Sequence, residues 1–361
     1  MTARYFPWMG GVEVHTHEVA RRLAALGHEV TVLTTDVSGE LPREEQVDGI
    51  HIKRVRAWPR RRDYYLAPAV YPVITGGAWD LVHCQGWQTF VAPLAMFAAW
   101  RAGIPYAVTF HTGGHSSRLR NAIRGLQRRL LRPLLAGATR LVAVSDFEAD
   151  LFANHLHLPR EQFAVIPNGS QLVMESAPVQ IDSTLILSVG RLERYKGHQR
   201  VIAALPEILE QCPDAHLRIL GSGPFEAVLR RLAAELGVAD RVEIGSIPVA
   251  DRGGMARTLA GSALVVLLSD FEAHPIAVME ALALGRPVLV TYTSGLAELA
   301  DRGLVASIPL ASTTHEIAQS VLENLRHPRQ AGNIVLPTWE DCVTDLLAVY
   351  DQALRESACV S

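Results

Sequence analysis

Ten short runs rich in leucine and β-branched residues follow one another along the chain, and amphipathic segments separate them. The runs of the first half are EVTVLTT, DLVHCQG, PYAVTFH, RLVAVS and FAVIPNG, and those of the second half are TLILSVG, HLRILGSG, RVEIGS, ALVVLLS and RPVLVTY. Apolar runs of this length are typical of strands buried on both faces of a parallel sheet. The alternation therefore predicts an α/β fold with parallel sheets.

The chain is expected to form two domains. Its 361 residues, 49% of them hydrophobic, are enough for two cores of ordinary size. Residues 170–183, SQLVMESAPVQIDS, are polar and show no clear periodicity, so we place the interdomain linker there. This division gives a first domain over residues 1–175, a second over 176–337 and a terminal segment over 338–361.

Both ends of the chain carry further expectations. The last segment is periodic as far as residue 356, follows Pro337 and begins with Thr338, a residue suited to cap a helix. Its length predicts a terminal helix that packs across both domains. Residues 1–11, MTARYFPWMGG, look like the tail of a first strand that runs into a glycine turn. Either that strand is truncated, or the true start lies upstream of Met1.

Composition narrows the class of protein. No apolar stretch reaches the roughly 20 residues of a membrane helix and no signal-peptide pattern follows Met1, so we expect a cytoplasmic protein. The four cysteines form no C-x-x-C pair, which fits a reducing compartment and argues against structural zinc. Residues 1–175 hold 19 basic and 15 acidic residues, against 15 and 22 afterwards, which suggests that the first half faces something anionic. The pI near 6.5 is nevertheless far from that of a typical nucleic-acid binder.

Two glutamates lie eight positions apart, Glu272 and Glu280 in SDFEAHPIAVMEALALG, and a basic pair precedes them, Arg191 and Lys196 in SVGRLERYKG. A diphosphate needs fixed cations, a ribose diol is well held by a carboxylate that accepts two hydrogen bonds, and an electron-poor sugar carbon needs negative charge nearby. Only Lys53 and Lys196 among the 34 basic residues are lysines. The set predicts a nucleotide-sugar site.

With these pairs and with YFPWMGGVEVHTHEVARRLAALGHEVTVLTT near its start, the chain resembles the retaining glycosyltransferases of family GT4, the glycogen synthase-like group or glycosyltransferase group 1. The resemblance covers nearly the whole chain, because GGVE, SVGR with KG, GSGP and the Glu-x7-Glu pair occur in the family order. It implies a GT-B fold, in which two Rossmann-like domains have parallel sheets that face a central cleft and the C-terminal helix crosses back to the first domain.

The resemblance implies a role for each charged residue of the two pairs. Arg191 and Lys196 would bind the diphosphate of the donor. Glu280 would accept hydrogen bonds from the ribose hydroxyls, and Glu272 would sit at the donor sugar as a catalytic residue. Glu280 lies in the apolar stretch AVMEALALG, where an unpaired carboxylate is costly, so we expect a bound ligand to offset that cost.

The loop between the two glutamates departs from the common family form, which has Glu-Gly-Phe-Gly where this chain has Glu272-Ala273-His274-Pro275. Proline has no N–H to offer a sugar hydroxyl, so the departure leaves the donor open. His274 either contacts the sugar directly or packs in the core. Pro275 is expected as the first residue of the helix that carries Glu280, whose positive end would point toward the diphosphate.

Three glycines and a histidine complete the expected site. Gly11, together with Gly10, forms the turn after the first strand, where the backbone can approach the donor or the acceptor. Gly221 and Gly223 form a similar loop after HLRIL. His111 follows the run PYAVTF at the carboxyl end of a strand, where open α/β sheets bind ligands. The resemblance makes it a catalytic residue at the transferred sugar, and the alternative is a histidine of the core.

No Ser-His-Asp or Cys-His set, no Asp-x-Asp pair and no cofactor lysine motif is visible in the sequence. His15 and His17 are two apart on a helix and do not share a face, so they make a poor metal pair. The resemblance implies front-face retention, in which the leaving diphosphate helps to deprotonate the acceptor. We therefore expect a metal-independent enzyme with no cofactor besides its nucleotide diphospho-sugar donor, and we interpret Asn168-Gly169 as a structural turn.

The acceptor is expected on the first domain, where RLRNAIRGLQRRLLRPLL begins at Arg118. On a helix, Arg120, Arg124 and Arg128 form one stripe that Arg132 continues. The opposite side holds Leu119, Ile123, Leu126, Leu130 and Leu134. Such a helix either lies on an anionic membrane or receives a lipid phosphate, or it has a solvated arginine face over a leucine face packed on the core. Residues 60–62, three arginines, add to the anionic interpretation.

Two classes of function follow. The first is a hexosyltransferase that extends a glycan or glycolipid of the cell envelope or an exported polysaccharide, with a small natural-product acceptor as the enzymatic alternative. It would work in the cytoplasm or at the inner face of the membrane. The second class is a non-catalytic binder of nucleotide sugars or lipids, which the short first strand and the altered Glu-Ala-His-Pro loop suggest. The intact basic and acidic pairs favour the enzyme.

Overall fold

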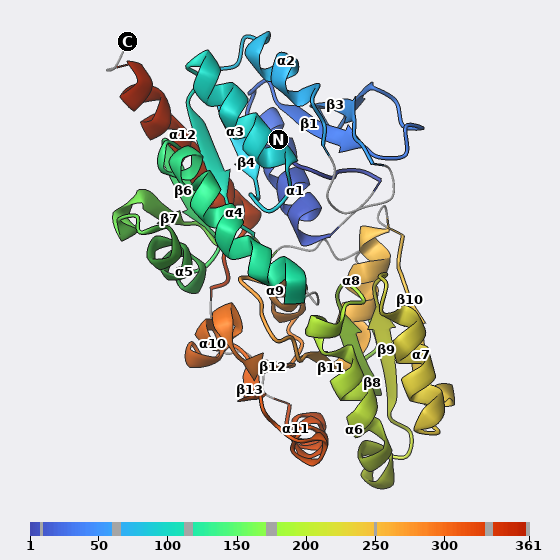
Figure 1. Ribbon diagram of the computed structural model, residues 1–361. Coiled ribbons are helices and arrows are strands. Elements are labelled where there is room, and N and C mark those ends of the chain that lie inside the picture. Colours follow the sequence, from blue (N-terminus) through green and yellow to red (C-terminus); the bar gives the residue numbers. More distant parts are fainter. Residues whose placement is uncertain are drawn as a thin grey trace. The chain divides into compact units, whose positions relative to one another are not determined.

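The structure is a computed structural model that describes residues 1–7, 10–59, 66–111, 118–170, 179–248, 251–328 and 335–358. For residues 118–124 it describes the backbone but not the side chains. The described residues form two compact units, which are presented one at a time (Figure 1). The first holds the described residues up to 169 and those from 337 onward, and the second holds those from 170 to 336.

The first unit contains two sheets that the first residues of the chain connect. A parallel sheet has the order β4-β5-β6-β7. A three-stranded sheet has the order β1-β3-β2, in which only β2 is antiparallel. Thr2 pairs with Gln85 in a parallel bridge, and its N–H donates to the Leu33 carbonyl 3.1 Å away, so residues 1–3 lie between the two sheets. The strands are β1 (Thr31–Asp36), β2 (Glu44–Val47), β3 (Ile50–Arg56), β4 (Val82–Gln85), β5 (Tyr106–Thr109), β6 (Arg140–Ala143) and β7 (Phe163–Val165).

Helices cover these strands in two groups. Neighbouring helices α2, α3, α4 and α5 contact one another in that order, and their apolar side chains form one core with the parallel strands. Helix α1 contacts α12, and Figure 1 shows α12 behind the strands that α3 and α4 cover from the front. The helices are α1 (Gly11–Ala25), α2 (Val70–Thr75), α3 (Val91–Ala102), α4 (Arg118–Ala136), α5 (Asp146–Leu156) and α12 (Trp339–Ala358). A 3-10 turn, η1 (Arg160–Gln162), precedes β7.

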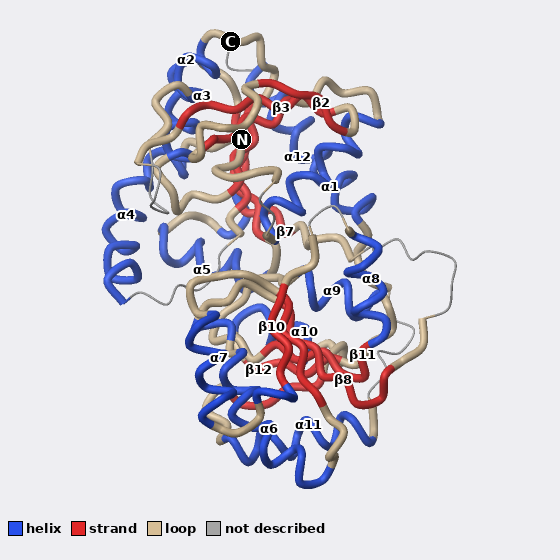
Figure 2. The backbone as a smooth tube through the Cα atoms, turned by 90° about the vertical axis from the view of Figure 1, so that its right-hand side faces the viewer, coloured by secondary structure: helices blue, strands red, loops and turns tan. Residues whose placement is uncertain are grey.

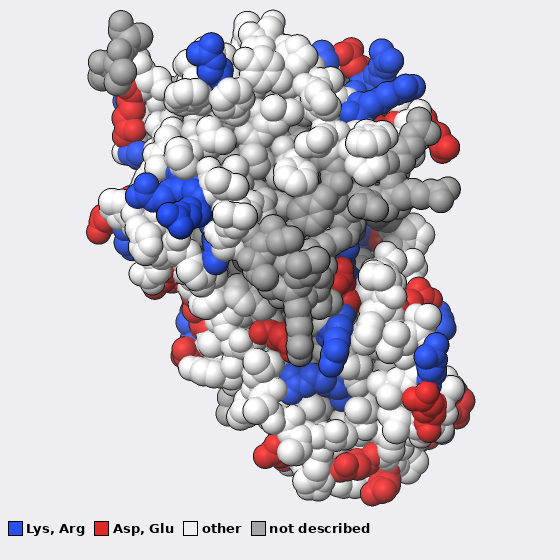
Figure 3. Space-filling view, viewed as in Figure 1, with Lys and Arg blue, Asp and Glu red and all other residues white. Residues whose placement is uncertain are grey.

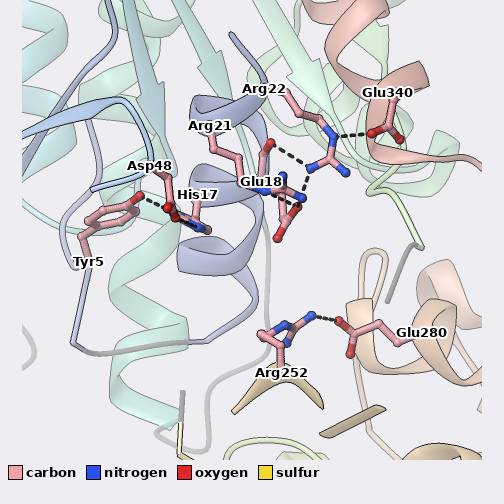
Figure 4. Close-up of polar contacts among 9 residues, drawn as sticks. All are labelled: Tyr5, His17, Glu18, Arg21, Arg22, Asp48, Arg252, Glu280 and Glu340. Carbon is pink, nitrogen blue, oxygen red and sulfur yellow. Dashed lines mark hydrogen bonds and ion pairs between the residues drawn. The ribbon is translucent and has the colours of Figure 1, made fainter. Parts of the chain in front are cut away.

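The terminal helix α12 belongs to the first unit. The Tyr350 hydroxyl lies 2.6 Å from Nδ1 of His83 on β4, and the Trp339 side chain is fully buried. On the surface, Arg22 of α1 donates to Glu340, with Nε 2.7 Å from Oε1 (Figure 4). A second ion pair joins Glu356 to a strand of the parallel sheet. These contacts confirm the expectation that the last helix returns to the first domain.

The second unit is a single parallel sheet of six strands in the order β10-β9-β8-β11-β12-β13. Its first strand, β8, lies in the interior, and the chain builds outward first on one side and then on the other. The order therefore reverses between β8 and β11, which is where open α/β sheets form ligand sites at their carboxyl edge. The strands are β8 (Asp182–Val189), β9 (His216–Leu220), β10 (Val242–Gly245), β11 (Ser262–Leu267), β12 (Val288–Tyr292) and β13 (Ala306–Pro309).

Two apolar layers enclose this sheet, one on each face. Side chains of α6, α7 and α11 form one buried cluster with the strands, and those of α8, α9 and α10 form another. Figure 2 shows the strands of this unit in red between helices on both sides. The helices are α6 (His198–Gln211), α7 (Glu226–Glu235), α8 (Arg252–Gly261), α9 (Ile276–Ala283), α10 (Ser294–Asp301) and α11 (Thr314–Arg326), with 3-10 turns η2 (Arg194–Lys196) and η3 (Ala239–Arg241).

All ten apolar runs of the sequence form strands, and the described residues contain three further strands that were not predicted. These are β2, β3 and β13. In β3, IHIKRVR, basic residues interrupt the apolar pattern, although Ile50 and Ile52 are fully buried against β1. In β2, EEQV, every residue is at least partly exposed, because this strand lies at the edge of its sheet. Pairing with neighbouring strands, rather than local composition, therefore determines that these segments are extended. No described helix is long and apolar enough to cross a membrane.

Candidate functional site

Most of the predicted residues of the second unit lie in segments that follow three neighbouring strands of the sheet. Arg191 and Lys196 follow β8, Gly221 and Gly223 follow β9, and Glu272 follows β11. Because the carboxyl ends of parallel strands meet at one edge of a sheet, the fold brings these loops together. Contacts between the loops, described next, define the candidate site.

A buried ion pair joins two of these loops. The Lys196 ammonium lies 2.5 Å from Oε1 of Glu272, and the Ser269 hydroxyl donates to the same oxygen at 2.7 Å. Burial alone would favour the neutral amine, but the nearby Glu272 carboxylate outweighs it and raises the pKa of Lys196. The ammonium therefore stays charged, and the pair is fixed before any donor arrives.

The backbone of Glu272 is hydrogen-bonded to the first two residues of α10. Its N–H donates to the Ser294 hydroxyl at 2.9 Å, and its carbonyl accepts from the Gly295 N–H at 2.9 Å. Ser294 has a φ of 47°, a left-handed conformation that is uncommon for a residue with a side chain. Nothing in the sequence pointed to Ser294, because a serine in YTSGL looks like an ordinary helix start.

Glu280 is paired with a residue that the sequence analysis missed. Its carboxylate is buried on α9 and accepts a hydrogen bond from Arg252, the first residue of α8 (Figure 4). Asp251 caps this helix, since its side chain accepts from the Gly254 N–H at 2.7 Å. The expectation that a bound ligand offsets the burial of Glu280 needs correction, because Arg252 already compensates its charge. Among many arginines, no sequence signal marks this one.

The loop with Arg191 is rigidly held. His198, buried on α6, lies with Nδ1 2.8 Å from the Ser188 hydroxyl and Nε2 3.3 Å from the Arg191 carbonyl. A Cβ on Gly221 would lie 1.9 Å from the Gly190 carbonyl oxygen, and one on Gly223 would lie 2.5 Å from a carbonyl of the same loop. These glycines therefore serve loop packing, whereas the Arg191 side chain is about half exposed and reaches solvent.

The Glu-Ala-His-Pro loop differs from expectation in one respect. Helix α9 begins at Ile276, so Pro275 is the residue before the helix and not its first residue. His274 is buried, and burial together with Arg302 lowers its pKa to about 4. Its imidazole is thus neutral at physiological pH. Whether it contacts a sugar stays a prediction.

The first unit gathers three histidines near the carboxyl ends of β4 and β5. His111 has Nε2 2.7 Å from Oε1 of Gln85, and its ring centroid lies 4.6 Å from that of His15. His15 has Nδ1 2.9 Å from the side-chain oxygen of Asn168. Burial lowers the pKa of His15 to about 4 and that of His111 and His83 well below the ordinary value. His111 is therefore a neutral hydrogen-bonding group.

The other predicted residues at the start of the chain are structural in their described contacts. Gly11 is the first residue of α1, and the N–H of Gly10 donates to Glu13 at 2.8 Å. His17 points to different partners from those of His15, with Nδ1 2.9 Å from the Tyr5 hydroxyl and Nε2 3.3 Å from Asp48 (Figure 4). The two side chains therefore have different partners, in agreement with their positions on different faces of the helix.

The described side chains of the arginine helix α4 differ in part from the predicted two-faced arrangement, and contact with a membrane or a lipid phosphate stays a prediction. Arg128 has Nη1 2.8 Å from Nδ1 of His155, and Arg132 donates to the carbonyls of Leu156 and His157 at the end of α5. Arg132 therefore binds the negative end of a neighbouring helix, Arg128 contacts a side chain of that helix's last turn, and these two arginines do not form a free cationic face. Of the leucines expected in the core, Leu126 and Leu130 are exposed. The side chains of Arg120 and Arg124 lie outside the described residues, as do residues 60–62.

Comparison with known proteins gives two family matches, which together cover most of the chain. Residues 9–172 match the model described as Glycosyltransferase Family 4, and residues 174–332 match Glycosyl transferases group 1. An uncharacterized glycosyltransferase of Methanocaldococcus jannaschii is 30% identical over 322 residues, covering 81% of this chain and 79% of that protein. A D-inositol 3-phosphate glycosyltransferase of Nocardiopsis dassonvillei is 28% identical over 408 residues, covering 97% of this chain and 92% of that protein.

Solved structures share the fold at lower identity. The sucrose-phosphate synthase from Thermosynechococcus elongatus has a TM-score of 0.71 at 20% identity and covers 97% of this chain and 93% of its own. The Anabaena protein HepE, solved in complex with UDP and glucose, has a TM-score of 0.70 at 17% identity and covers 99% of this chain and 98% of its own. With both family models matched in order and a 30% identical relative over most of its length, this chain belongs to the group 1, family 4 glycosyltransferases of GT-B fold.

Proposed function

We propose that the protein transfers a hexosyl group from a nucleotide diphospho-sugar to a glycan or glycolipid acceptor in cell-envelope or exopolysaccharide synthesis. We further propose that the anomeric configuration is retained and that no metal ion or other cofactor is required. The observation that carries the proposal is the buried Lys196–Glu272 ion pair at the carboxyl edge of the second sheet. A charged ammonium beside a fixed carboxylate would supply the charges that a departing diphosphate and an electron-poor sugar carbon need.

The cations of the site would stabilise the leaving group. Glu272 holds the Lys196 side chain in place, so little conformational entropy would be lost when the ammonium also contacts a diphosphate. Arg191 is exposed enough to reach a phosphate and offers several N–H donors. Together they would replace the metal ion that many diphosphate-binding sites use.

The carboxylates would divide two tasks. Glu280 accepts a hydrogen bond from Arg252, and its carboxylate would also accept a ribose hydroxyl. Glu272 would face the sugar carbon as it becomes positive, and neutral His111 would hydrogen-bond the transferred sugar. In the reaction the bond from the sugar carbon to the diphosphate oxygen breaks and the bond to the acceptor oxygen forms on the same face. The acceptor proton passes to the departing diphosphate.

A second candidate is transfer to a small phosphorylated polyol. Several relatives that cover nearly the whole chain are named D-inositol 3-phosphate glycosyltransferases. Their identity to this chain is 26–28%, a range in which acceptors can differ while the donor machinery is kept. Residues 81–145, which hold eight arginines and no acidic residue, suit an acceptor with a phosphate group as well as a lipid-linked one.

The test is a two-part donor screen. Thermal stabilisation of the purified protein by a panel of nucleotide sugars identifies the donor, beginning with UDP-sugars because a protein of the same fold was solved with UDP and glucose. Release of nucleoside diphosphate is then followed with and without chelator, and with polyol phosphates or lipid-linked acceptors. Activity that chelator abolishes and magnesium restores would refute metal independence. Stabilisation by a donor without any release would instead indicate a non-catalytic binder.

A further inference from the structure

The two ring nitrogens of His111 have different surroundings. His111 lies just after β5, and its Nε2 is 2.7 Å from Oε1 of Gln85, the last residue of β4. No described residue hydrogen-bonds to its Nδ1, and the His111 side chain is partly exposed. The Gln85 side chain is buried. One nitrogen of the ring is therefore tied to the protein, and the other is available to a ligand.

The neighbouring residue His83 decides which end of the Gln85 amide faces His111. Both ring nitrogens of His83 are engaged, Nδ1 with the Tyr350 hydroxyl at 2.6 Å and Nε2 with the Thr109 hydroxyl at 2.7 Å. The amide nitrogen of Gln85 lies 3.5 Å from each of them, so it packs against the ring rather than in line with one lone pair. An N–H group is attracted to the electron-rich face of an aromatic ring, and a carbonyl oxygen is repelled there. The amide oxygen of Gln85 is therefore the atom that faces His111.

This arrangement fixes the position of the proton on His111. An amide oxygen can only accept a hydrogen bond, so Nε2 of His111 carries the hydrogen. In a neutral imidazole the other nitrogen, Nδ1, then has a free lone pair. Burial, together with His15 and His83, lowers the pKa of His111 well below its ordinary value. At physiological pH the available nitrogen of His111 is therefore a hydrogen-bond acceptor.

The groups around the ring are uncharged. Figure 3 shows Lys, Arg, Asp and Glu side chains on the surface of the molecule, whereas the partner of His111 is an amide. The titratable groups that act on His111 are His15 on α1 and His83 on β4, and burial lowers the pKa of both, so they are neutral as well. A carboxylate in place of the Gln85 amide would instead favour the imidazolium, which has a hydrogen on both nitrogens.

Packing holds the two side chains in place. The ring of His15 lies edge to face with that of His111, with centroids 4.6 Å apart and an angle of 69° between the planes. The Gly86 N–H donates to the Thr109 carbonyl at 2.7 Å, which joins the carboxyl ends of β4 and β5 where Gln85 and His111 leave them. The φ of His111 is 48°, a left-handed conformation that the surrounding structure must maintain. The orientation of the ring is therefore set before a ligand binds.

We propose that Gln85 is a positioning residue for glycosyl transfer: its amide oxygen holds His111 in the tautomer whose Nδ1 accepts a hydrogen bond from a hydroxyl of the transferred sugar. This inference rests on the proposed function, in which His111 contacts that sugar. The other tautomer would reverse the direction of the hydrogen bond, and the sugar hydroxyl could no longer donate there. Gln85 acts through His111 and does not itself touch the substrate.

Nitrogen NMR on the full chain tests the tautomer without any donor. With ¹⁵N-labelled histidine, the His111→Gln variant identifies the His111 signals by their loss. The wild type should have hydrogen on Nε2 of His111 and none on Nδ1. Gln85→Leu removes the acceptor at similar volume, so it should give a mixture of the two tautomers. Gln46→Leu is the control, because Gln46 is exposed on β2, and it should leave the signals unchanged.

Activity then separates positioning from packing. It is followed as release of nucleoside diphosphate, with UDP-glucose as the first donor. Gln85→Leu should lower kcat about tenfold at every pH with little change in donor KM, because the reacting geometry is lost and donor binding is kept. Melting temperature monitors folding, and if Gln85→Leu folds poorly, the pH profile of Gln85→Glu still decides.

Gln85→Glu supplies a pH-dependent rescue. Its carboxylate accepts the same hydrogen bond, so the variant should recover most of the wild-type kcat at about pH 8.5. The carboxylate also stabilises the imidazolium and should raise the pKa of His111 by about 1–3 units. The protonated ring has no lone pair on Nδ1, so activity should be lost as the pH falls through that raised pKa, where the wild type stays active. Gln46→Glu, the same substitution at an exposed position, should follow the wild type.

Three results would overturn the proposal. The first is hydrogen on Nδ1 of His111 in the wild type, and the second is an unchanged tautomer in Gln85→Leu. The third is a loss of activity in Gln85→Glu that is equal at every pH, which would assign Gln85 to packing alone. If the wild type turns over no nucleotide sugar, the proposed transfer function fails together with this role. The NMR measurement then still shows whether Gln85 sets the tautomer of His111, so the two failures are distinguishable.

Discussion

Lys196 and Glu272 form a buried ion pair, with Nζ 2.5 Å from Oε1, although 76 positions separate them in the sequence. Two charges removed from water are costly unless each compensates the other. The pair therefore places a cation and an anion side by side at the edge of the sheet. Both charges would contact a ligand that carries a diphosphate and an electron-poor carbon. Removing either partner should be costly, because the other charge would then be buried and unpaired.

Lys196→Ala should lower kcat/KM strongly. Loss of one preorganised electrostatic partner costs about 2–4 kcal/mol of transition-state stabilisation, which corresponds to roughly 30- to 1,000-fold. Lys53→Ala is the matched control, because Lys53 is the only other lysine and forms an ion pair with Glu44 at the surface. The control should retain activity. A loss below about threefold in Lys196→Ala would place the diphosphate elsewhere.

Glu280→Gln and Glu272→Gln should affect different kinetic constants. A carboxylate that holds the ribose acts in the ground state and the transition state alike, so Glu280→Gln should raise KM for the donor. A carboxylate that faces the developing positive charge acts only in the transition state, so Glu272→Gln should mainly lower kcat. Steady-state kinetics with the donor varied distinguishes these results. If both variants changed donor affinity alone, the division of tasks would be wrong.

Arg252→Gln tests the cation that the sequence did not reveal. Without the guanidinium, the buried Glu280 carboxylate loses its charged partner, which should cost about 1–3 kcal/mol of folding stability. Donor affinity should fall with it, because Glu280 would be held less firmly. Arg252→Lys should restore part of both. Denaturant unfolding and nucleotide titration measure the two effects, and Arg257→Gln on the same helix serves as the surface control.

Ser294→Ala should weaken catalysis through the position of Glu272. The hydroxyl of Ser294 accepts the Glu272 N–H, and its loss frees the loop that carries the carboxylate. We expect kcat to fall about tenfold, with donor KM nearly unchanged, since small displacements of a reacting group are costly. Ser294→Gly relaxes the left-handed backbone but lacks the hydroxyl, so it should resemble Ser294→Ala in activity and exceed it in stability. Equal activity of Ser294→Ala and the wild type would contradict this role.

The stability of the protein should fall as the pH drops from about 6.5 toward 4. Burial lowers the pKa of His15, His198 and His274 to about 4, so the folded state resists a proton that the unfolded state accepts. Each such histidine contributes stability that is complete above pH 6.5 and is lost as the pH falls, by about 2 kcal/mol at pH 5. His15→Gln should flatten the pH dependence of the unfolding free energy, and His28→Gln, at an exposed position, should leave the slope unchanged.

The sequence determined most of the strands and the residue types of the site. Apolar runs such as ALVVLLS form buried parallel strands, because a strand that is buried on both faces excludes most polar and charged side chains. Glu272, Glu280, Arg191 and Lys196 could also be predicted as candidate residues, because each of them lies in a short motif. Local chemistry was enough for these features.

The tertiary structure decided which charges meet. Arg252 reaches Glu280 from α8, and Ser294 reaches Glu272 from the start of α10. Neither contact can be recognised in the local sequence. The helical pattern of α4 gave the periodicity of its arginines and leucines but not their direction. Arg128 turned toward α5 and Leu130 toward solvent, because the end of a neighbouring helix offered hydrogen-bond acceptors to the arginine side. Sequence specifies which side chains share a face, and only packing against neighbouring elements decides what that face meets.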